Sequence, residues 1–257
     1  YVHLATSEQK AEEYTLYVKK AVDLAGNYIL PVFGRASFTG STIPDTLKPF
    51  YLAMTPADSS LLVPLESDIH IYFSEAMDTS SVARHISLSD TASNPVPVRK
   101  CWNNMAHFIL EPVKELVEKT PYLVRLPVDS VFDLSRNSFK DTVFVKKFTT
   151  VSLDTLSEIT GAIVDMDSTA TGPFEITAMS ITGNKYSQRI SGNAYRFERI
   201  LPGVYLLQVF RDEDQNGIYS MGSVFPYKPS ERFFLYPDTI SVRSRWPNEG
   251  NDIIFPW

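Results

Sequence analysis

Apolar residues in this chain recur at every second position in short runs, and Pro, Asn, Asp, Ser and Gly bound those runs. Such alternation turns one side of a run toward a core and the other toward solvent, which is typical of β-strands. The clearest runs are Ile69–Phe73, Ile176–Ile181 and Tyr205–Val209, with shorter ones around Phe108 and Val124. The chain is therefore predicted to be all-β.

Helical spacing of apolar residues is confined to two short pieces, Ser7–Glu13 and Val113–Lys119. Isolated helices shorter than about 12 residues are marginal in water. Both pieces are therefore predicted to be single turns that connect strands, and a helical bundle is excluded.

One segment of the chain occurs twice with the same spacing. In each copy an alternating strand, residues 14–18 or 122–126, is followed by an Asp-Leu-x-x-Asn turn and by a last strand that ends in Phe-Thr. The turns are Asp23–Asn27 and Asp133–Asn137, each equally far from its closing Phe-Thr. Asp and Asn side chains bond nearby backbone groups, and Asn tolerates a left-handed conformation. We interpret these residues as turn formers, the alternative being a role as ligands.

The second copy also has a front half, meaning the strands of the domain that precede the repeated segment. The strand Ile69–Phe73 continues into Ser74-Glu-Ala-Met-Asp78, and Leu110-Glu-Pro112 and Thr120-Pro-Tyr122 follow before the closing Phe148-Thr-Thr150. Over about residues 50–150, this order of motifs resembles the SbsA-type bacterial Ig-like domain. That family is an antiparallel β-sandwich of S-layer and other cell-surface proteins, often in tandem.

The turn of the second copy departs from the family at one position. Arg136 stands where the family usually has glycine, and the first copy keeps this glycine as Gly26. Glycine adopts a positive φ without steric cost. The departure therefore concerns the geometry of this turn and leaves the predicted fold unchanged.

The first copy has no front half. Residues 1–42 are predicted to be the C-terminal part of a truncated Ig-like domain, with a strand at Val2 and Leu4 and the last two strands at Tyr14–Val18 and Val32–Phe38. Two or three strands alone are marginal in water. We therefore expect the chain to be part of a longer polypeptide, or this part to dock on a neighbouring domain or a partner chain.

A second kind of sandwich is expected after the polar bridge Ser152–Ile159. The run from Tyr195 through Leu201-Pro-Gly203 to Tyr205, within about residues 158–257, resembles the carboxypeptidase-regulatory, prealbumin-like domain. The closing stretch also resembles domain ends in surface lipoproteins of Bacteroidetes-type bacteria. The predicted domains, arranged as an elongated tandem of sandwiches, are residues 1–42, 43–150 and 151–257.

Charge and composition exclude several classes of protein. The chain has 24 Lys and Arg against 30 Asp and Glu, for a net charge of -6, and no long basic run. Neutralising phosphates requires clustered basic residues, so neither nucleic acid nor a membrane surface is expected as a partner. No segment holds the roughly 18 to 20 consecutive apolar residues of a transmembrane helix. Cys101, the one cysteine, is interpreted as a buried small hydrophobe.

One loop has the residue types of a calcium site. Asp212, Asp214 and Asn216 provide oxygen donors at positions one, three and five, glycine follows at six, and the carbonyl of Ile218 stands at seven. This is the first half of a calcium loop, but positions nine and twelve are serine, so the bidentate glutamate is absent. The candidate ligands are Asp212, Asp214, Asn216 and Ile218, and a solvated hairpin loop is the favoured interpretation.

Aromatic residues near the end of the chain form a candidate binding face. Phe225 and Tyr227 lie in a long segment between strands, Asp212–Tyr236, and Trp246 follows it. Aromatic side chains dominate interface energies and stack on flat ligands. We favour the interpretation that they fill the core of a sandwich, and the binding face is the alternative.

Sequence signatures of enzymes are missing. The chain has no Gly-x-Ser-x-Gly elbow, no glycine-rich phosphate loop and no His-Glu-x-x-His, which are the motifs of several hydrolase, nucleotide-binding and protease classes. The histidines are dispersed, and His70 and His107 are predicted to face solvent from a sheet. No catalytic residue and no further cofactor is predicted.

The resemblance implies a non-catalytic, extracytoplasmic scaffold or binding protein. It would be the Ig-like portion of a bacterial outer-membrane or cell-surface lipoprotein, with a lipid anchor upstream, that engages a protein partner in an envelope assembly. The alternative is an accessory spacer or carbohydrate-binding region of a larger secreted enzyme whose catalytic domain is not in this chain.

Overall fold

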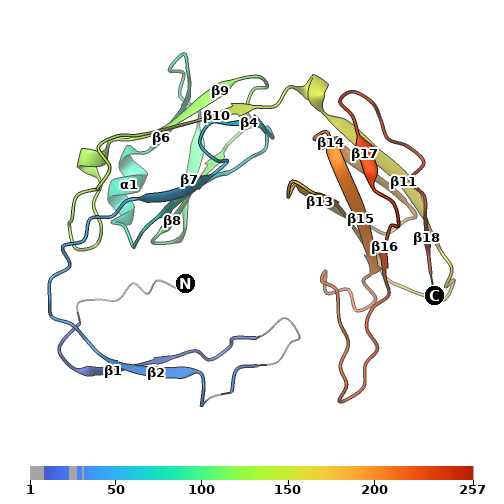
Figure 1. Ribbon diagram of the computed structural model, residues 1–257, viewed down its shortest axis with the longest axis horizontal. Coiled ribbons are helices and arrows are strands. Elements are labelled where there is room, and N and C mark those ends of the chain that lie inside the picture. Colours follow the sequence, from blue (N-terminus) through green and yellow to red (C-terminus); the bar gives the residue numbers. More distant parts are fainter. Residues whose placement is uncertain (1–8, 23–27, 31, 257) are drawn as a thin grey trace. The chain divides into compact units, whose positions relative to one another are not determined.

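The computed structural model describes residues 9–22, 28–30 and 32–256. The chain divides into two compact units, Tyr1–Val151 and Ser152–Trp257, whose strands are drawn in Figure 1. Nearly all regular structure in the described residues is β, so the predicted fold class is confirmed. The elongated arrangement of the units stays a prediction.

The first unit contains a two-stranded sheet and two four-stranded sheets (Figure 1). The sheet orders are β1-β2, β4-β10-β9-β6 and β3-β5-β8-β7. Their bounds are β1 Glu13–Tyr17, β2 Arg35–Thr39, β3 Tyr51–Thr55, β4 Ser60–Val63, β5 Ile69–Phe73, β6 Ser87–Asp90, β7 Val98–Asn104, β8 His107–Pro112, β9 Pro121–Leu126 and β10 Phe144–Thr150.

A hydrophobic core joins the two four-stranded sheets. The alternation in β5 buries Ile69, Ile71 and Phe73 while the residues between them stay half-buried. These three side chains belong to one cluster with Val124 of β9 and Phe148 of β10, from the other sheet. The alternating apolar residues thus form the interior of a sandwich, as the sequence predicts.

The first unit also contains a helix that the sequence pattern did not indicate. α1 (Thr79–His85) begins at Asp78, whose carboxylate accepts hydrogen bonds from the backbone N–H groups of Ser80 and Ser81, and Val82 anchors it in the core. The available signal was Asp78, since Asp is a preferred N-cap residue. Val113–Lys119 forms bends and a turn rather than a helix, as predicted.

The second unit pairs a three-stranded sheet with a five-stranded one. The sheet orders are β14-β11-β18 and β13-β12-β15-β16, with β17 also paired to β15. The bounds are β11 Ser157–Asp165, β12 Phe174–Ser180, β13 Lys185–Ile190, β14 Ala194–Ile200, β15 Gly203–Arg211, β16 Phe233–Leu235, β17 Ile240–Val242 and β18 Ile253–Phe255. Two 3-10 turns, η1 Val128–Ser130 and η2 Leu153–Thr155, complete the regular structure of the described residues.

Strand β15 is the centre of the second core. Tyr205, Leu207 and Val209 are buried at alternate positions and pack with Ile176 of β12 and Phe255 of β18. The hydroxyl of Tyr205 donates to the Leu201 carbonyl at 2.7 Å, and burial raises its pKa. Most strand pairs are antiparallel, as predicted. Two pairs, β4 with β10 and β11 with β18, are parallel, and the prediction of antiparallel sandwiches did not include them.

Two expectations for single residues are corrected. Cys101 is a free, half-buried thiol on β7 rather than a fully buried one. His70 and His107 alternate with core residues and stand on the outer side of the sheet, as predicted, but they are half-buried, and Nδ1 of His70 lies 3.0 Å from Nε2 of His107, so they also pair with each other. Burial, and then the charge of His70, lower the pKa of His107.

Candidate functional site

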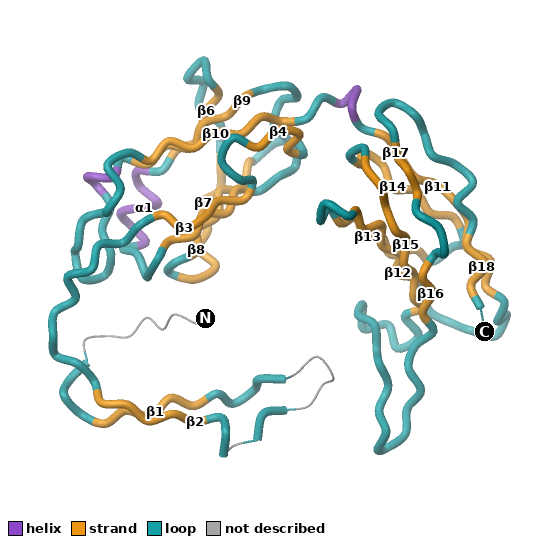
Figure 2. Tube along the Cα trace, viewed as in Figure 1, coloured by secondary structure: helices purple, strands orange, loops and turns teal. Residues whose placement is uncertain are grey.

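A long loop between β15 and β16 carries most of the predicted site residues, and Figure 2 shows it extending from the sheet. The two ends of the loop, near Asp212 and Glu231, are its two arms and together form its neck. The first arm is fixed by Asp212, which is fully buried. Its carboxylate accepts hydrogen bonds from the backbone N–H groups of Asn216 and Gly217, each at 3.0 Å. It also pairs with the guanidinium of Arg189 on β13 at 2.9 Å. Local sequence therefore closes the turn, and a distant strand supplies its counter-charge.

The other arm is fixed by Glu231, which is also buried. Its carboxylate accepts hydrogen bonds from the N–H groups of Glu213 and Ser220, each at 2.9 Å. The N–H of Glu231 in turn donates to the carbonyl of Ser220 at 2.9 Å. Glu231 thus joins the two arms of the loop, a role that no sequence motif indicated.

Aromatic and ionic contacts support the neck from the flanking strands. Tyr219 packs edge-on against Phe210 of β15 and Phe233 of β16, with ring centroids 5.7 and 5.6 Å apart. Arg232 donates to Asp165 at the end of β11 at 2.7 Å. Burial opposes ionisation of Asp165, yet the hydrogen bond from Arg232 holds its pKa below the usual range. The base of the loop is therefore held by contacts with β11, β15 and β16.

The tip of the loop is apolar and open to solvent. The exposed fraction of Phe225 is 95% and that of Tyr227 is 80%, and Val224 and Met221 are also exposed. Ser223 and Lys228 exchange two backbone hydrogen bonds across the tip, at 3.0 and 2.9 Å. The favoured interpretation from the sequence, that these aromatics fill the sandwich core, is therefore wrong for Phe225 and Tyr227.

The structure places Trp246, the third residue of the predicted binding face, elsewhere. Trp246 is 72% exposed, and its carbonyl accepts a hydrogen bond from Ser157 at the start of β11. The base of the loop bonds to Asp165, which ends the same nine-residue strand. Since a strand rises about 3.3 Å per residue, Trp246 lies at the opposite end of the unit from Phe225 and Tyr227. The three residues do not form one face.

The predicted calcium ligands are partly brought together. Carboxylate oxygens of Asp212 and Asp214 lie within 4.8 Å of each other and of one from Glu231, and hard oxygen donors of this kind suit calcium. The Asn216 amide group instead donates to Asp214 at 3.0 Å, and its Oδ1 accepts from the N–H of Ile218 at 2.8 Å. Glu231 supplies the acidic group that the loop sequence lacks, and calcium binding here stays a prediction.

The turn in the repeated segment has the predicted role. Asp133 is buried and accepts the N–H of Asn137 at 2.7 Å and its amide group at 2.8 Å. Arg136, at the position where the family usually has glycine, adopts a φ of 68°, the left-handed region that glycine occupies most easily. The corresponding turn Asp23–Asn27 lies outside the described residues, as does the strand expected at Val2 and Leu4.

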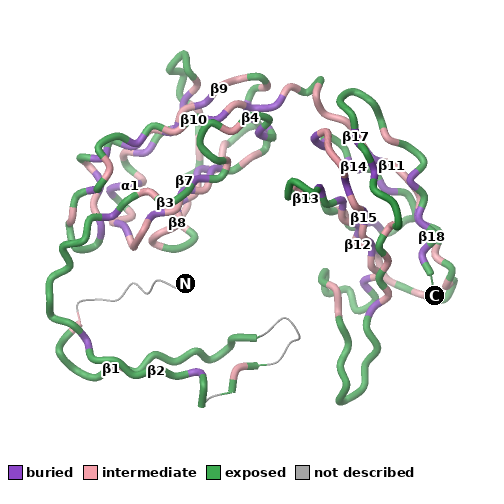
Figure 3. The backbone as a smooth tube through the Cα atoms, viewed as in Figure 1, coloured by how far each residue is buried: buried purple, intermediate pink, exposed green. Residues whose placement is uncertain are grey.

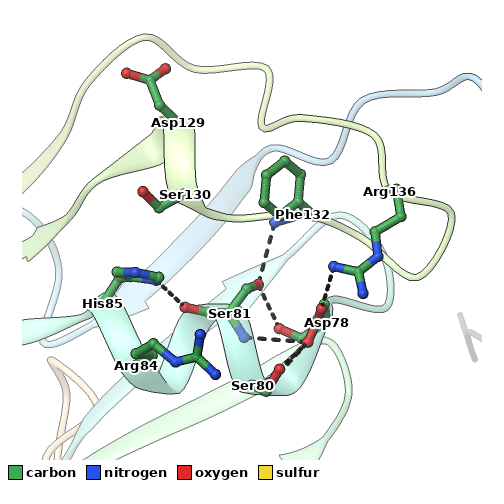
Figure 4. A pocket seen from close by; sticks show the side chains of 9 residues that line it. All are labelled: Asp78, Ser80, Ser81, Arg84, His85, Asp129, Ser130, Phe132 and Arg136. Atoms are coloured by element: carbon green, nitrogen blue, oxygen red, sulfur yellow. Dashed lines mark hydrogen bonds and ion pairs between the residues drawn. The ribbon is translucent and has the colours of Figure 1, made fainter.

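A polar pocket of about 440 Å³ lies beside α1, and Figure 4 shows its lining. Asp78 accepts from the Ser80 hydroxyl at 2.7 Å, which holds its pKa below the usual range, and from Arg136 at 3.1 Å. Ser81 accepts from the N–H of Phe132 at 3.3 Å. These groups are engaged with one another, and they connect α1 to the segment before β10.

Residues 45–150 match the family model of the bacterial Ig-like domain. The match covers β3 to β10 and includes Asp78, Asp133 and the closing Phe148. It confirms the Ig-like prediction for this part of the chain, while the SbsA type and the carboxypeptidase-regulatory resemblance of residues 158–257 stay predictions.

Several solved structures are similar to this chain at low identity. CopC from Methylosinus trichosporium OB3b is 14% identical over 40% of this chain and 93% of its own, with a TM-score of 0.33. The N-terminal part of the bacterial S-layer protein SbsC is 14% identical over 65% of this chain and 41% of its own, with a TM-score of 0.32. An L,D-transpeptidase from Mycobacterium smegmatis is 12% identical over 80% and 88%, with a TM-score of 0.33. No curated protein matches the chain.

Within the described part of the chain, no helix is both long and apolar enough to cross a membrane.

Proposed function

We propose that this chain is a non-catalytic scaffold on the outside of a bacterial cell, and that it binds a protein partner through the tip of the β15–β16 loop, Met221–Lys228. The observation that carries this proposal is the high exposure of Phe225 and Tyr227 on a loop whose neck is held by two buried carboxylates. Exposed apolar groups on an ordered support are typical of binding sites.

The energetics of association favour such a loop. Burying an aromatic side chain at an interface contributes more than most other contacts. Part of that gain is normally lost when a flexible loop becomes ordered, at about 0.5–1.5 kcal/mol for each immobilised side chain. Here Asp212, Glu231 and the Ser223–Lys228 pair already order the backbone, so less free energy is lost on binding.

The cellular location rests on the family match. A bacterial Ig-like domain at residues 45–150 supports an extracytoplasmic site. Anchoring as an outer-membrane lipoprotein, a prealbumin-like second unit and membership of an envelope assembly are the finer parts of the proposal, and they rest on the resemblances of the sequence.

A second candidate function is favoured by Trp246. This residue is 72% exposed at the other end of the second unit, and an exposed aromatic ring offers a flat apolar face to a ligand. On this hypothesis the chain is an accessory, carbohydrate-binding region of a larger secreted enzyme, and Trp246 rather than the tip carries the binding.

Affinity purification from the source envelope after mild detergent extraction separates the two functions. The bait is compared with the double variant Phe225→Ser/Tyr227→Ser and with Trp246→Ser as the matched exposed-aromatic control. We expect a stoichiometric protein to be lost with the tip variant and retained with Trp246→Ser, each variant keeping the parent unfolding temperature. Retention of the protein partner by the tip variant, or its loss with Trp246→Ser alone, contradicts the proposed function.

A further inference from the structure

The β1–β2 sheet has an apolar face that is exposed to solvent. Leu16 and Phe38 point to one side of the sheet and are 37% and 41% exposed, and Figure 3 shows both strands mostly in the exposed class. On the other side Thr15 and Ser37 place their hydroxyls 3.2 Å apart. The pattern is that of a sheet with one side against a core.

Both outer edges of this sheet are also open. Among the residues that the structure describes, β1 and β2 pair with each other and with no third strand. A two-stranded sheet is marginal in water by itself, and unpaired edges are templates for further strands. The sheet therefore has the properties of an incomplete module.

The intact Ig-like domain contains the same hairpin. Tyr14 pairs with Phe38 in register as Tyr122 pairs with Phe148. The stacked rings are 5.8 Å apart at 20° in the first pair and 5.6 Å apart at 27° in the second. The sequence repeat is thus a repeat of geometry as well.

A second contact repeats with the rings. The hydroxyl of Tyr14 accepts the backbone N–H of Lys10 at 3.0 Å, and that of Tyr122 accepts the N–H of Val117 at 2.9 Å. Each tyrosine therefore ties the strand to the segment before it, as in the tyrosine corners of Ig-like sandwiches. β1 corresponds to β9, and β2 corresponds to β10.

The intact copy shows what covers such a hairpin. β6 pairs with the outer edge of β9 and β4 with that of β10. The sheet β3-β5-β8-β7 lies on the apolar face, and Tyr122 and Phe148 are buried beneath it. In the chain, β3 to β8 all precede β9.

We propose that the β1–β2 sheet is the receiving half of a second Ig-like sandwich, and that its occupant is a front-half segment N-terminal to β1 in the same polypeptide. This segment supplies strands equivalent to β4 and β6 at the two edges and an apolar sheet over Leu16 and Phe38. It carries apolar residues at alternate positions, because only such strands match the alternation of β1 and β2. The interface involves no residue of the Met221–Lys228 tip.

Hydrogen exchange compares the protein isolated from its source envelope with the chain Tyr1–Trp257. We expect residues 13–17 and 35–39 to exchange about a hundredfold more slowly in the native protein, since exchange protection follows the stability of the local structure. The native polypeptide should also exceed 29.0 kDa under denaturing conditions. Phe38→Ser should remove the protection in the native protein, whereas Ser37→Ala on the outer face should keep it.

Three results would overturn this interface. The first is fast exchange of both strands in the native protein. The second is protection that appears in Tyr1–Trp257 alone as its concentration rises, which identifies a second copy as the occupant. The third is protection supplied by a different polypeptide that separates under denaturing conditions. Phe38→Leu, which preserves an apolar contact, distinguishes a lost interface from a misfolded hairpin because it should retain most of the protection.

Discussion

Two turns of the same sequence type, Asp133–Asn137 and Asp212–Asn216, close loops in different units. In each, the buried Asp accepts the backbone N–H of the Asn, at 2.7 and 3.0 Å. The residue before the Asn has a positive φ, 68° at Arg136 and 59° at Gln215. The two turns therefore share this hydrogen bond and this left-handed residue, and short-range chemistry accounts for both.

The charges around the two turns differ. Asp133 lies beside Asp45 and Glu75, and Asp212 beside Asp214 and Glu231. Asp212 also pairs with Arg189, whereas burial and then the charges of Asp45 and Asp133 raise the pKa of Glu75. Local sequence thus determines the turn, and the tertiary structure determines how its buried charge is balanced.

The largest expected effect comes from removing the buried carboxylates. We expect Asp212→Ala to lower the free energy of unfolding by about 3 kcal/mol, because it removes the buried acceptor of the Asn216 and Gly217 N–H groups and the carboxylate that pairs with the half-exposed Arg189. Asp133→Ala should cost about 2 kcal/mol through the N–H groups alone. Hydrogen exchange in β15 and β5 measures the two units separately.

The exposed turn Asp90–Asn94 provides the control for both variants. Asn94 donates its N–H to Asp90 at 2.8 Å, but this turn is in solvent, so Asp90→Ala should cost less than either change above. Equal losses at Asp212 and Asp133 would show that Arg189 adds nothing to the second turn.

Calcium binding provides the next test of the difference between the two turns. Extracellular calcium modules bind with Kd near 10⁻⁴ to 10⁻³ M, and a ligand at about thirty times its Kd stabilises the folded state by about 2 kcal/mol. We expect about 10 mM calcium to raise the unfolding temperature of the second unit through Asp212, Asp214 and Glu231. Asp214→Asn should remove the increase while leaving the buried neck in place. An unchanged unfolding temperature in calcium, or a full increase in Asp214→Asn, contradicts the predicted site.

A smaller effect is expected at the left-handed residue of the first turn. Arg136→Gly should raise the free energy of unfolding by about 0.5–1 kcal/mol, because glycine adopts this φ without strain. The lost ion pair with Asp78 is exposed on the arginine side and contributes little. Chemical denaturation compares the glycine variant with Arg136→Lys, which keeps the backbone strain and should leave the free energy of unfolding nearly unchanged. A destabilised glycine variant would show that the contact with Asp78 outweighs the strain.

The sequence predicted what depends on neighbours along the chain. Alternation located β5 and β15 and their buried sides, and the Asp-x-x-x-Asn pattern located the turn at Asp133. The repeat located β1 and β2 as a hairpin. In each case the determining interactions, strand periodicity and side chain to backbone hydrogen bonds, are local and leave a regular signature.

What depends on contacts between distant segments was missed. Glu231 reaches the neck of the loop from its far arm, and Arg189 reaches it from β13. His70 and His107 meet across two paired strands, and Trp246 is separated from Phe225 by the length of β11. These relations follow from sheet register and strand order, which alternation along one strand does not specify.

The smallest effect tests the carboxylate cluster that Glu75 forms with Asp45 and Asp133. A carboxyl whose pKa is raised in the folded state binds its proton more tightly there than in the unfolded chain. Its contribution to stability is therefore complete below the unfolded pKa and is lost as pH rises through the raised folded pKa. Glu75→Gln removes this loss, so the first unit should gain on the order of 0.5 kcal/mol at pH 7 and nothing near pH 4. Denaturation at both pH values, with the exposed Glu13→Gln as control, measures the difference. A variant that is less stable than the parent at pH 7 would mean that the Glu75 carboxylate is compensated in the fold, as that of Asp212 is by Arg189.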